Sequence, residues 1–213
     1  MPEVSPRELL LVLGAYLLGS IPFGVIFARL FAGRDVRASG SGNIGATNVV
    51  RVAGPLPGVL TLCCDTVKGA FSVWAAGRLT DHSAAWMMLA GLAALVGHCF
   101  PVWLRLKGGK GVATALGIFA TLSLPAAAGA LLFFLIVVLI WRYVSLGSVA
   151  AAAAMPLLVY FLWAPRHAPP LVITFGTLFA AALVIYKHDA NLQRLVEGTE
   201  PQFNLGKSKD DAQ

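Results

Sequence analysis

Charged side chains are scarce in this chain. Asp, Glu, Lys and Arg together form 12% of its 213 residues, which is about half the share that soluble domains carry. Hydrophobic residues reach 58% and mean hydropathy is +0.77, so an ordinary soluble domain is excluded. The composition predicts an all-α, polytopic membrane protein embedded in a lipid bilayer. The net charge of +6 fits basic loops that face anionic lipids, and we expect no nucleic-acid partner.

Cysteine is also rare, and metal ligands do not cluster. Cys63, Cys64 and Cys99 lie in apolar sequence, which predicts small buried hydrophobes rather than a disulfide framework. No set of His, Cys and carboxylate residues has the spacing of a metal site. A transferase that uses nucleotide-activated alcohols needs clustered carboxylates for Mg²⁺, and the acidic residues here are too scattered. We therefore expect neither a metal nor a cofactor.

Long apolar segments recur along the chain. Each is a candidate membrane span, because about 20 apolar residues cross a bilayer and fewer suffice where neighbours bury the helix. The candidates are 8–32, 54–79, 84–104, 112–124, 126–142, 146–163 and 170–187. We expect residues 1–200 to form one membrane domain and residues 201–213 to form a cytoplasmic tail.

The region 112–142 decides the topology, because its apolar sequence suits either one long helix or two short helices. Arg34, Arg37 and Arg51 place the first loop in the cytoplasm by the positive-inside rule. Two short helices place Arg142 and the basic C-terminal tail on the same side, whereas one long helix would put that tail outside. The sequence thus predicts seven transmembrane helices, with the N-terminus out and the C-terminus in, and a short fourth helix tucked between others.

The first polar loop, Ser39–Arg51, concentrates glycines and small polar residues. Glycines let the backbone turn tightly and present N–H groups to an anion. Neutral hydrogen-bonding groups come from Ser41, Asn43, Thr47 and Asn48. Arg51 adds a planar, permanent positive charge. This inventory favours a phosphate or another anion bound at a membrane surface, and the alternative is a solvated turn between two spans.

A second loop, Lys107–Thr114, is rich in glycine and lysine and leads into a helix. Glycine amides, a helix N-terminus and a lysine can converge on phosphate oxygens. The candidate binding residues are Lys107, Gly108, Gly109, Lys110 and Thr114. The loop is not a Walker A motif, because Gly111 follows Lys110 and no strand precedes it. The alternative is a basic loop that only orients the protein.

Two further polar clusters remain. His188, Asn191 and Arg194 follow the last span at a spacing that lets them share one helix face. Asp65 and Lys68 lie three residues apart inside the second span, where charges are costly, which favours a functional or cavity-lining pair over a structural ion pair. His98 lies in the third span, and a lone histidine on an apolar helix is more often a packed core group than a catalyst.

Taken together, these motifs resemble the PlsY family of bacterial acyl-phosphate:glycerol-3-phosphate acyltransferases. The resemblance runs through Ser39–Arg51, Asp65–Gly69, Gly97–Pro101, Lys107–Thr114 and Lys187–Glu200, in that order on seven expected spans. It implies transfer of a fatty acyl group from acyl phosphate to the sn-1 hydroxyl of glycerol 3-phosphate, without coenzyme A. The products would be lysophosphatidic acid and phosphate. It also implies an upstream enzyme that makes acyl phosphate.

The resemblance assigns roles to individual residues. It implies that the activity depends on Ser41, Arg51, His188 and Asn191. The glycine-rich loop would bind glycerol 3-phosphate with Lys110 as a phosphate contact, and Glu200 would hold structure. The family lies in the bacterial inner (cytoplasmic) membrane with its active site facing the cytoplasm, which agrees with the topology inferred from the charges.

Acyl phosphate is a mixed anhydride with a good leaving group, so the site has chiefly to position the hydroxyl and neutralise two phosphates. The candidate cations for the phosphates are Arg51, Lys110 and Lys68. We expect direct attack without an acyl-enzyme, with Ser41 binding phosphate or orienting the hydroxyl. His188 or a substrate phosphate oxygen would serve as the base. The His-x-x-x-x-Asp pattern of another glycerol-phosphate acyltransferase class is absent. The competing hypothesis is an organic-phosphate or anion transporter, which would use the same anion-binding groups.

Overall fold

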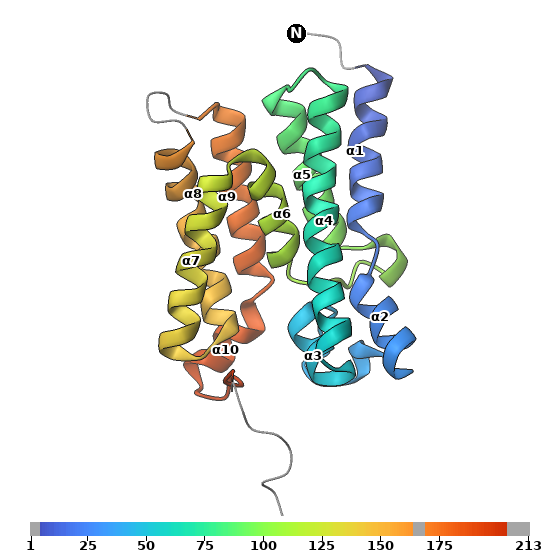
Figure 1. Ribbon diagram of the computed structural model, residues 1–213, viewed down its shortest axis with the longest axis vertical. Helices are drawn as coiled ribbons and strands as arrows, with labels where there is room; N and C mark the ends of the chain where they lie inside the picture. The colour runs from blue at the N-terminus through green and yellow to red at the C-terminus, as the bar shows by residue number, and fades with distance from the viewer. Residues whose placement is uncertain (1–4, 164–168, 204–213) are drawn as a thin grey trace, which may run out of the picture.

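The computed structural model describes residues 5–163 and 169–203, which form helices and connecting loops without any strand. The α-helices are α1 (Pro6–Gly19), α2 (Phe23–Ala32), α3 (Ala46–Ala53), α4 (Pro55–Leu79), α5 (Ala84–Cys99), α6 (Val112–Leu122), α7 (Leu124–Trp141), α8 (Val144–Leu162), α9 (Leu171–Tyr186) and α10 (Asp189–Val196). Two short 3-10 helices, η1 (Val36–Ala38) and η2 (Val102–Leu104), lie in loops. Helices α2, α3 and α10 lie at one end of the bundle, opposite the start of α1 (Figure 1).

The expected span 8–32 is interrupted in the middle. Pro6 begins α1 behind a capping turn in which the Ser5 N–H donates to Glu8 at 2.9 Å. The helix stops at Gly19, and α2 starts only after Pro22, whose ring removes a backbone donor from the helical ladder. Both halves together still form a 27-residue apolar segment.

Small residues let the helices approach closely. A Cβ at Gly69 of α4 or at Gly117 of α6 would overlap the backbone of the other helix. Gly19 of α1 and Gly97 of α5 make the same kind of contact. Glycine at such crossings allows backbones to pack without side chains between them, as is common in membrane helices. These crossings bring α4 against α6 and α1 against α5.

The region 112–142 forms two helices, as the charge distribution predicted. The break is at Ser123, which ends α6 and precedes α7. With 11 residues, α6 is about 17 Å long and cannot cross a bilayer alone. It packs against α4, α5 and α7. The two-helix interpretation of this region is therefore confirmed.

The number of spans is established only in part. Within residues 5–163 and 169–203, five segments are long and apolar enough to cross a membrane. A sixth is obtained if α9 and α10, which meet at a 56° bend, count as one span. Residues 204–213 of the expected tail, with Lys207 and Lys209, lie outside the described residues.

Candidate active site

The first polar loop is organised by one buried side chain, Asn48 of α3. Its Oδ1 accepts a hydrogen bond from the Ser41 N–H at 2.8 Å. Its amide nitrogen donates, over 2.9–3.1 Å, to the carbonyls of Val36, Ser39 and Asn43. Both polar side-chain atoms of Asn48 are thus used by this loop and by η1 just before it. These contacts indicate that Asn48 holds the loop in its conformation, and they disfavour the predicted contact between Asn48 and substrate.

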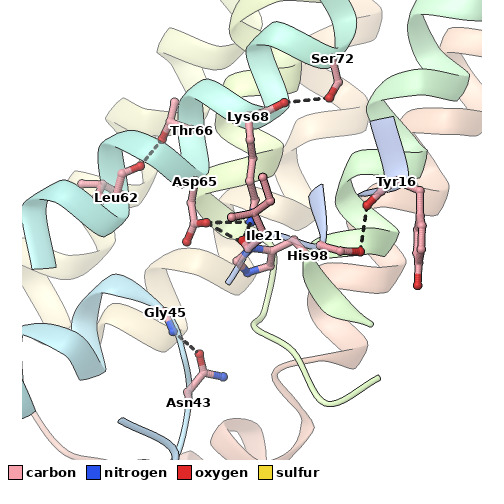
Figure 2. Close-up of polar contacts among 11 residues, drawn as sticks. Tyr16, Ile21, Asn43, Gly45, Leu62, Asp65, Thr66, Lys68, Ser72 and His98 are labelled. Atoms are coloured by element: carbon pink, nitrogen blue, oxygen red, sulfur yellow. Dashed lines mark hydrogen bonds and ion pairs between the residues drawn. The ribbon is translucent and has the colours of Figure 1, made fainter. Parts of the chain in front are cut away.

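The other polar side chains of this loop differ in whether they are bonded within the protein or exposed. Asn43 accepts from the Gly45 N–H at 2.8 Å in the turn that precedes α3 (Figure 2). Thr47 is exposed on α3, and Arg51 is exposed in its last turn. Ser41 is exposed as well, with its hydroxyl unbonded within the described chain. Ser41 and Arg51 are therefore exposed to a ligand, and their predicted roles stay predictions.

A cleft of about 790 Å³ separates the first loop from the glycine-rich loop. Ser41 and Asn43 line one wall, and Lys107 and Gly108 line the other. Its remaining charged lining comes from Asp35, Arg37, Arg105 and Lys187. From sequence, the arginines indicated only topology, so their place in this cleft was missed. The excess of cations makes the cleft suited to an anionic ligand.

Asp35 is the acidic residue in the cleft wall, and it is already paired. Its carboxylate accepts from Arg37 at 2.6 Å and from Arg29 at 3.1 Å. The hydrogen bonds from Arg37 hold the pKa of Asp35 well below its usual range. This carboxylate therefore stays ionised and orders Arg37 at the cleft.

The glycine-rich loop is seated on the end of α5. The Gly108 N–H donates to the Cys99 carbonyl at 3.2 Å, and the Gly109 N–H donates to the His98 carbonyl at 3.1 Å. The last carbonyls of a helix lack partners within it, and the loop supplies them. The two glycine amides predicted to face an anion are occupied in this way. Glycine is required here because a Cβ would overlap α5 rather than because its amides are free.

Lys110 reaches from this loop to the far end of the chain. Its ammonium donates to Oδ1 of Asn191 in α10, 81 residues away. The Asn191 amide donates to Glu200 at 2.6 Å, and Arg194 donates to the same carboxylate at 2.8 Å. Asn191 and Arg194 share a helix face, as their spacing predicted. Two motifs that are distant in sequence are thus joined by one polar network.

Burial and neighbouring charges together change the pKa of Lys110. Burial lowers its pKa to about 8, with Glu200 opposing the shift and Arg194 and Arg51 adding to it. Lys110 is thus mostly protonated at pH 7. The contribution of Arg51 shows that the charge of the first loop lies near enough to act on the second. Burial opposes a lowered pKa for Glu200, but hydrogen bonds from groups that include Asn191 and Arg194 hold its pKa below the usual range.

His188 lies between α9 and α10 and is buried. Its Nδ1 lies 2.7 Å from the Val184 carbonyl, which can only accept, so Nδ1 carries the proton and Nε2 keeps its lone pair. Burial lowers the pKa of His188 to about 4, and the nearby Lys110 charge adds to this effect against the Val184 hydrogen bond. The imidazole is therefore neutral at physiological pH and can accept a proton at Nε2.

Asp65 and Lys68 face the interior of the bundle rather than the cleft. They pair at 2.8 Å with side chains only 4% and 2% exposed. Lys68 also donates to the Ile21 carbonyl, at the break between α1 and α2, over 3.0 Å (Figure 2). His98 is buried beside them, as predicted for a core group. The ammonium of Lys68 is enclosed, which disfavours its predicted contact with substrate. Thr114 is buried too, against Gly69 of α4.

The described chain is an all-helical bundle with several apolar segments long enough to cross a membrane, which defines an integral membrane protein. The cations gathered at one end suit it to an anionic ligand. The family model for glycerol-3-phosphate acyltransferase matches residues 9–198. The chain belongs to this glycerol-3-phosphate acyltransferase family, which confirms the resemblance seen in its motifs.

Relatives cover nearly the whole chain. The glycerol-3-phosphate acyltransferase of Syntrophotalea carbinolica is 54% identical over 91% of this chain and 96% of its own. That of Geobacter sulfurreducens is 48% identical over 92% and 98%. The crystal structure of PlsY (YgiH), an integral membrane glycerol 3-phosphate acyltransferase, in its glycerol 3-phosphate form has a TM-score of 0.86 at 40% identity, covering 93% and 96%. Its lysophosphatidic acid form has a TM-score of 0.84 at 38% identity, with the same coverage.

Proposed function

We propose that this protein transfers a fatty acyl group from acyl phosphate to the sn-1 hydroxyl of glycerol 3-phosphate. Its family and its relatives support acylation of glycerol 3-phosphate, and PlsY has been solved with this substrate and with lysophosphatidic acid. The observation that carries the proposal is the contact between Lys110 and Asn191. It draws the glycine-rich loop and the last helix to one place, near the charge of Arg51.

Cations at this place bind the phosphates. Lys110 and Arg51 supply positive charge to oxygens of the glycerol 3-phosphate and acyl phosphate groups, with Lys107 on the cleft wall. Ser41 donates its hydroxyl to a phosphate or orients the attacking alcohol. Asn191 holds Lys110 in place and Glu200 holds Asn191. Asn48, Asp65 and Lys68 act as structural residues, which revises the binding roles expected for Asn48 and Lys68.

The acyl group passes directly to glycerol 3-phosphate. The sn-1 oxygen attacks the acyl carbonyl carbon, and the bond from that carbon to the phosphate oxygen breaks. The hydroxyl proton goes to Nε2 of His188 or to a phosphate oxygen, and inorganic phosphate leaves. A neutral His188 with a low pKa is a weak base, but a mixed anhydride needs little base assistance. Ser41 and His188 share no hydrogen bond in the described chain, which supports direct attack over an acyl-serine intermediate.

The same placement supports the predicted topology. We infer seven crossings in a bacterial inner membrane, with α6 as the short one, the N-terminus outside and the polar clusters at the cytoplasmic face. The gathering of α3 and α10 at one end of the bundle supports this orientation (Figure 1), as do the basic residues there. A cytoplasmic site has direct access to water-soluble glycerol 3-phosphate, and an upstream enzyme supplies the acyl phosphate.

Phosphate release by the purified protein in nanodiscs tests the activity. Palmitoyl phosphate and glycerol 3-phosphate together should give phosphate and lysophosphatidic acid in equal amounts, and either substrate alone should give neither. Protein reconstituted in vesicles tests the competing transport function. Uptake of glycerol 3-phosphate without any acylation would refute the proposed enzyme activity and support the transporter hypothesis.

A further inference from the structure

The end of α5 is the meeting point of several distant segments. Its last carbonyls accept hydrogen bonds from the glycine-rich loop, and the Cys99 carbonyl also accepts from Lys187 at 3.3 Å. The next carbonyl, of Phe100, accepts from the Tyr16 hydroxyl at 2.9 Å. One helix end therefore sets the position of the glycine-rich loop relative to α1 and α9. The side chain that faces the glycine-rich loop at this junction is His98.

The His98 ring lies between Asp65 on one side and Gly109 on the other. Its Nδ1 faces Oδ1 of Asp65 at 3.6 Å, and Lys68 fixes that carboxylate at 2.8 Å (Figure 2). On the other side the ring lies directly under Gly109, where a Cβ would overlap its Nε2 and neighbouring ring atoms. Gly109 precedes Lys110 in the chain. The buried cluster is thus connected to the phosphate-binding lysine through one close contact.

We propose that His98, packed beside the Asp65–Lys68 pair, is a positioning residue that seats Gly109 and thereby fixes Lys110 in the binding site. The proposal rests on the proposed function and adds to it a residue buried beneath the site. His98 touches no substrate in this scheme. Its ring surface determines how deeply the loop sits on α5, and its contact with Asp65 determines where that surface lies. A histidine that only filled the core would not couple to one loop residue.

A double-mutant cycle on the contact tests this proposal. Gly109→Ala forces the loop off the ring and should lower kcat/KM about tenfold or more. His98→Ala removes the seat, and KM for glycerol 3-phosphate should rise about tenfold with a smaller change in kcat. The double variant has room for the added methyl group, so its activity should exceed that of Gly109→Ala. Gly14→Ala, at a site with nothing within 4 Å, is the matched control and should behave like wild type.

The outcomes separate the two proposals. If the reductions in kcat/KM of the two single variants simply multiply in the double variant, Gly109 is not seated on His98 and this proposal is overturned. Normal turnover by the wild-type protein would still support the proposed function. Wild-type protein that fails to acylate glycerol 3-phosphate would instead refute the function itself. If Gly109→Ala does not fold, recovery of folded protein in the double variant supports the contact, and failure of both overturns it. The pH profile gives an independent readout, because a displaced Lys110 loses its buried setting and the rise of KM near pH 8 should move to higher pH.

Discussion

Asn191 offers the sharpest test of the site, because its side chain bonds two charged groups. Its oxygen accepts from the Lys110 ammonium and its nitrogen donates to Glu200 at 2.6 Å. A hydrogen bond to a charged group contributes about 1.5–3 kcal/mol. Asn191→Ala removes the acceptor that places Lys110, so kcat/KM should fall about 10- to 150-fold if that energy is lost from the transition state. Phosphate release at varied glycerol 3-phosphate concentration measures the change.

Gln193→Ala is the matched control on the same helix. Gln193 is exposed, and among the described residues its side chain bonds only to exposed Asp189, at 3.3 Å, so its loss should change kcat/KM less than about threefold. Asn191→Asp separates the two bonds, since it keeps an acceptor for Lys110 but sets a carboxylate against Glu200 and near the substrate phosphate. It should be no better than alanine. Equal kinetics for Asn191→Ala and Gln193→Ala would refute the reasoning, as would a lowered melting temperature with unchanged kinetics.

Three other predictions address chemistry, charge and stability. Wild-type protein treated with acyl phosphate alone should show no acyl group on Ser41 by mass spectrometry; a trapped acyl-serine would exclude direct attack. Lys110 is charged below its pKa of about 8 and neutral above it, so KM for glycerol 3-phosphate should rise between pH 7 and 9. Lys110→Arg should flatten that rise because guanidinium stays charged, and an unchanged pH profile would assign the titration to another group. Asp65→Asn should lower the free energy of unfolding by about 3–5 kcal/mol because it leaves the buried charge of Lys68 without its partner. Adding Lys68→Met should restore part of the lost stability. A further drop in melting temperature in the double variant would contradict the view that the pair is buried together.

Most of the helices were predictable because apolar length alone marks a segment that must satisfy its backbone internally. The pair α6 and α7 was predictable as well, since only two helices put the basic residues on one side. The interruption at Ser20–Pro22 was missed although the proline was visible, because the flanking apolar sequence continues across it. Helix α3 was missed for the opposite reason. Its eight residues are too few and too polar to stand out from a glycine-rich loop.

The site was less predictable than the fold, because its contacts join segments that are distant in sequence. Motif spacing singled out Lys110 and Asn191 separately, but nothing in the sequence pairs residues 81 positions apart. The glycines of the second loop were found for the wrong physical reason. The amides of Gly108 and Gly109 are taken by the carboxyl end of α5. Side chains are excluded there because a Cβ at Gly108 would overlap the end of α5 and a Cβ at Gly109 would overlap the His98 ring.

Lys68 shows why a charge inside a membrane segment is ambiguous from sequence. An ionised group is costly in lipid, which favours a function, but an interrupted span creates a second need. Ile21 lies at the break before α2, so its carbonyl falls outside the regular helical ladder and accepts instead from the Phe23 N–H at 3.1 Å. Lys68 supplies a second donor to this carbonyl, and Asp65 balances the charge of Lys68. When a span is interrupted by proline and an acid–base pair is buried beside it, the pair is therefore better interpreted as a hydrogen-bonding partner of the interrupted helix than as a ligand site.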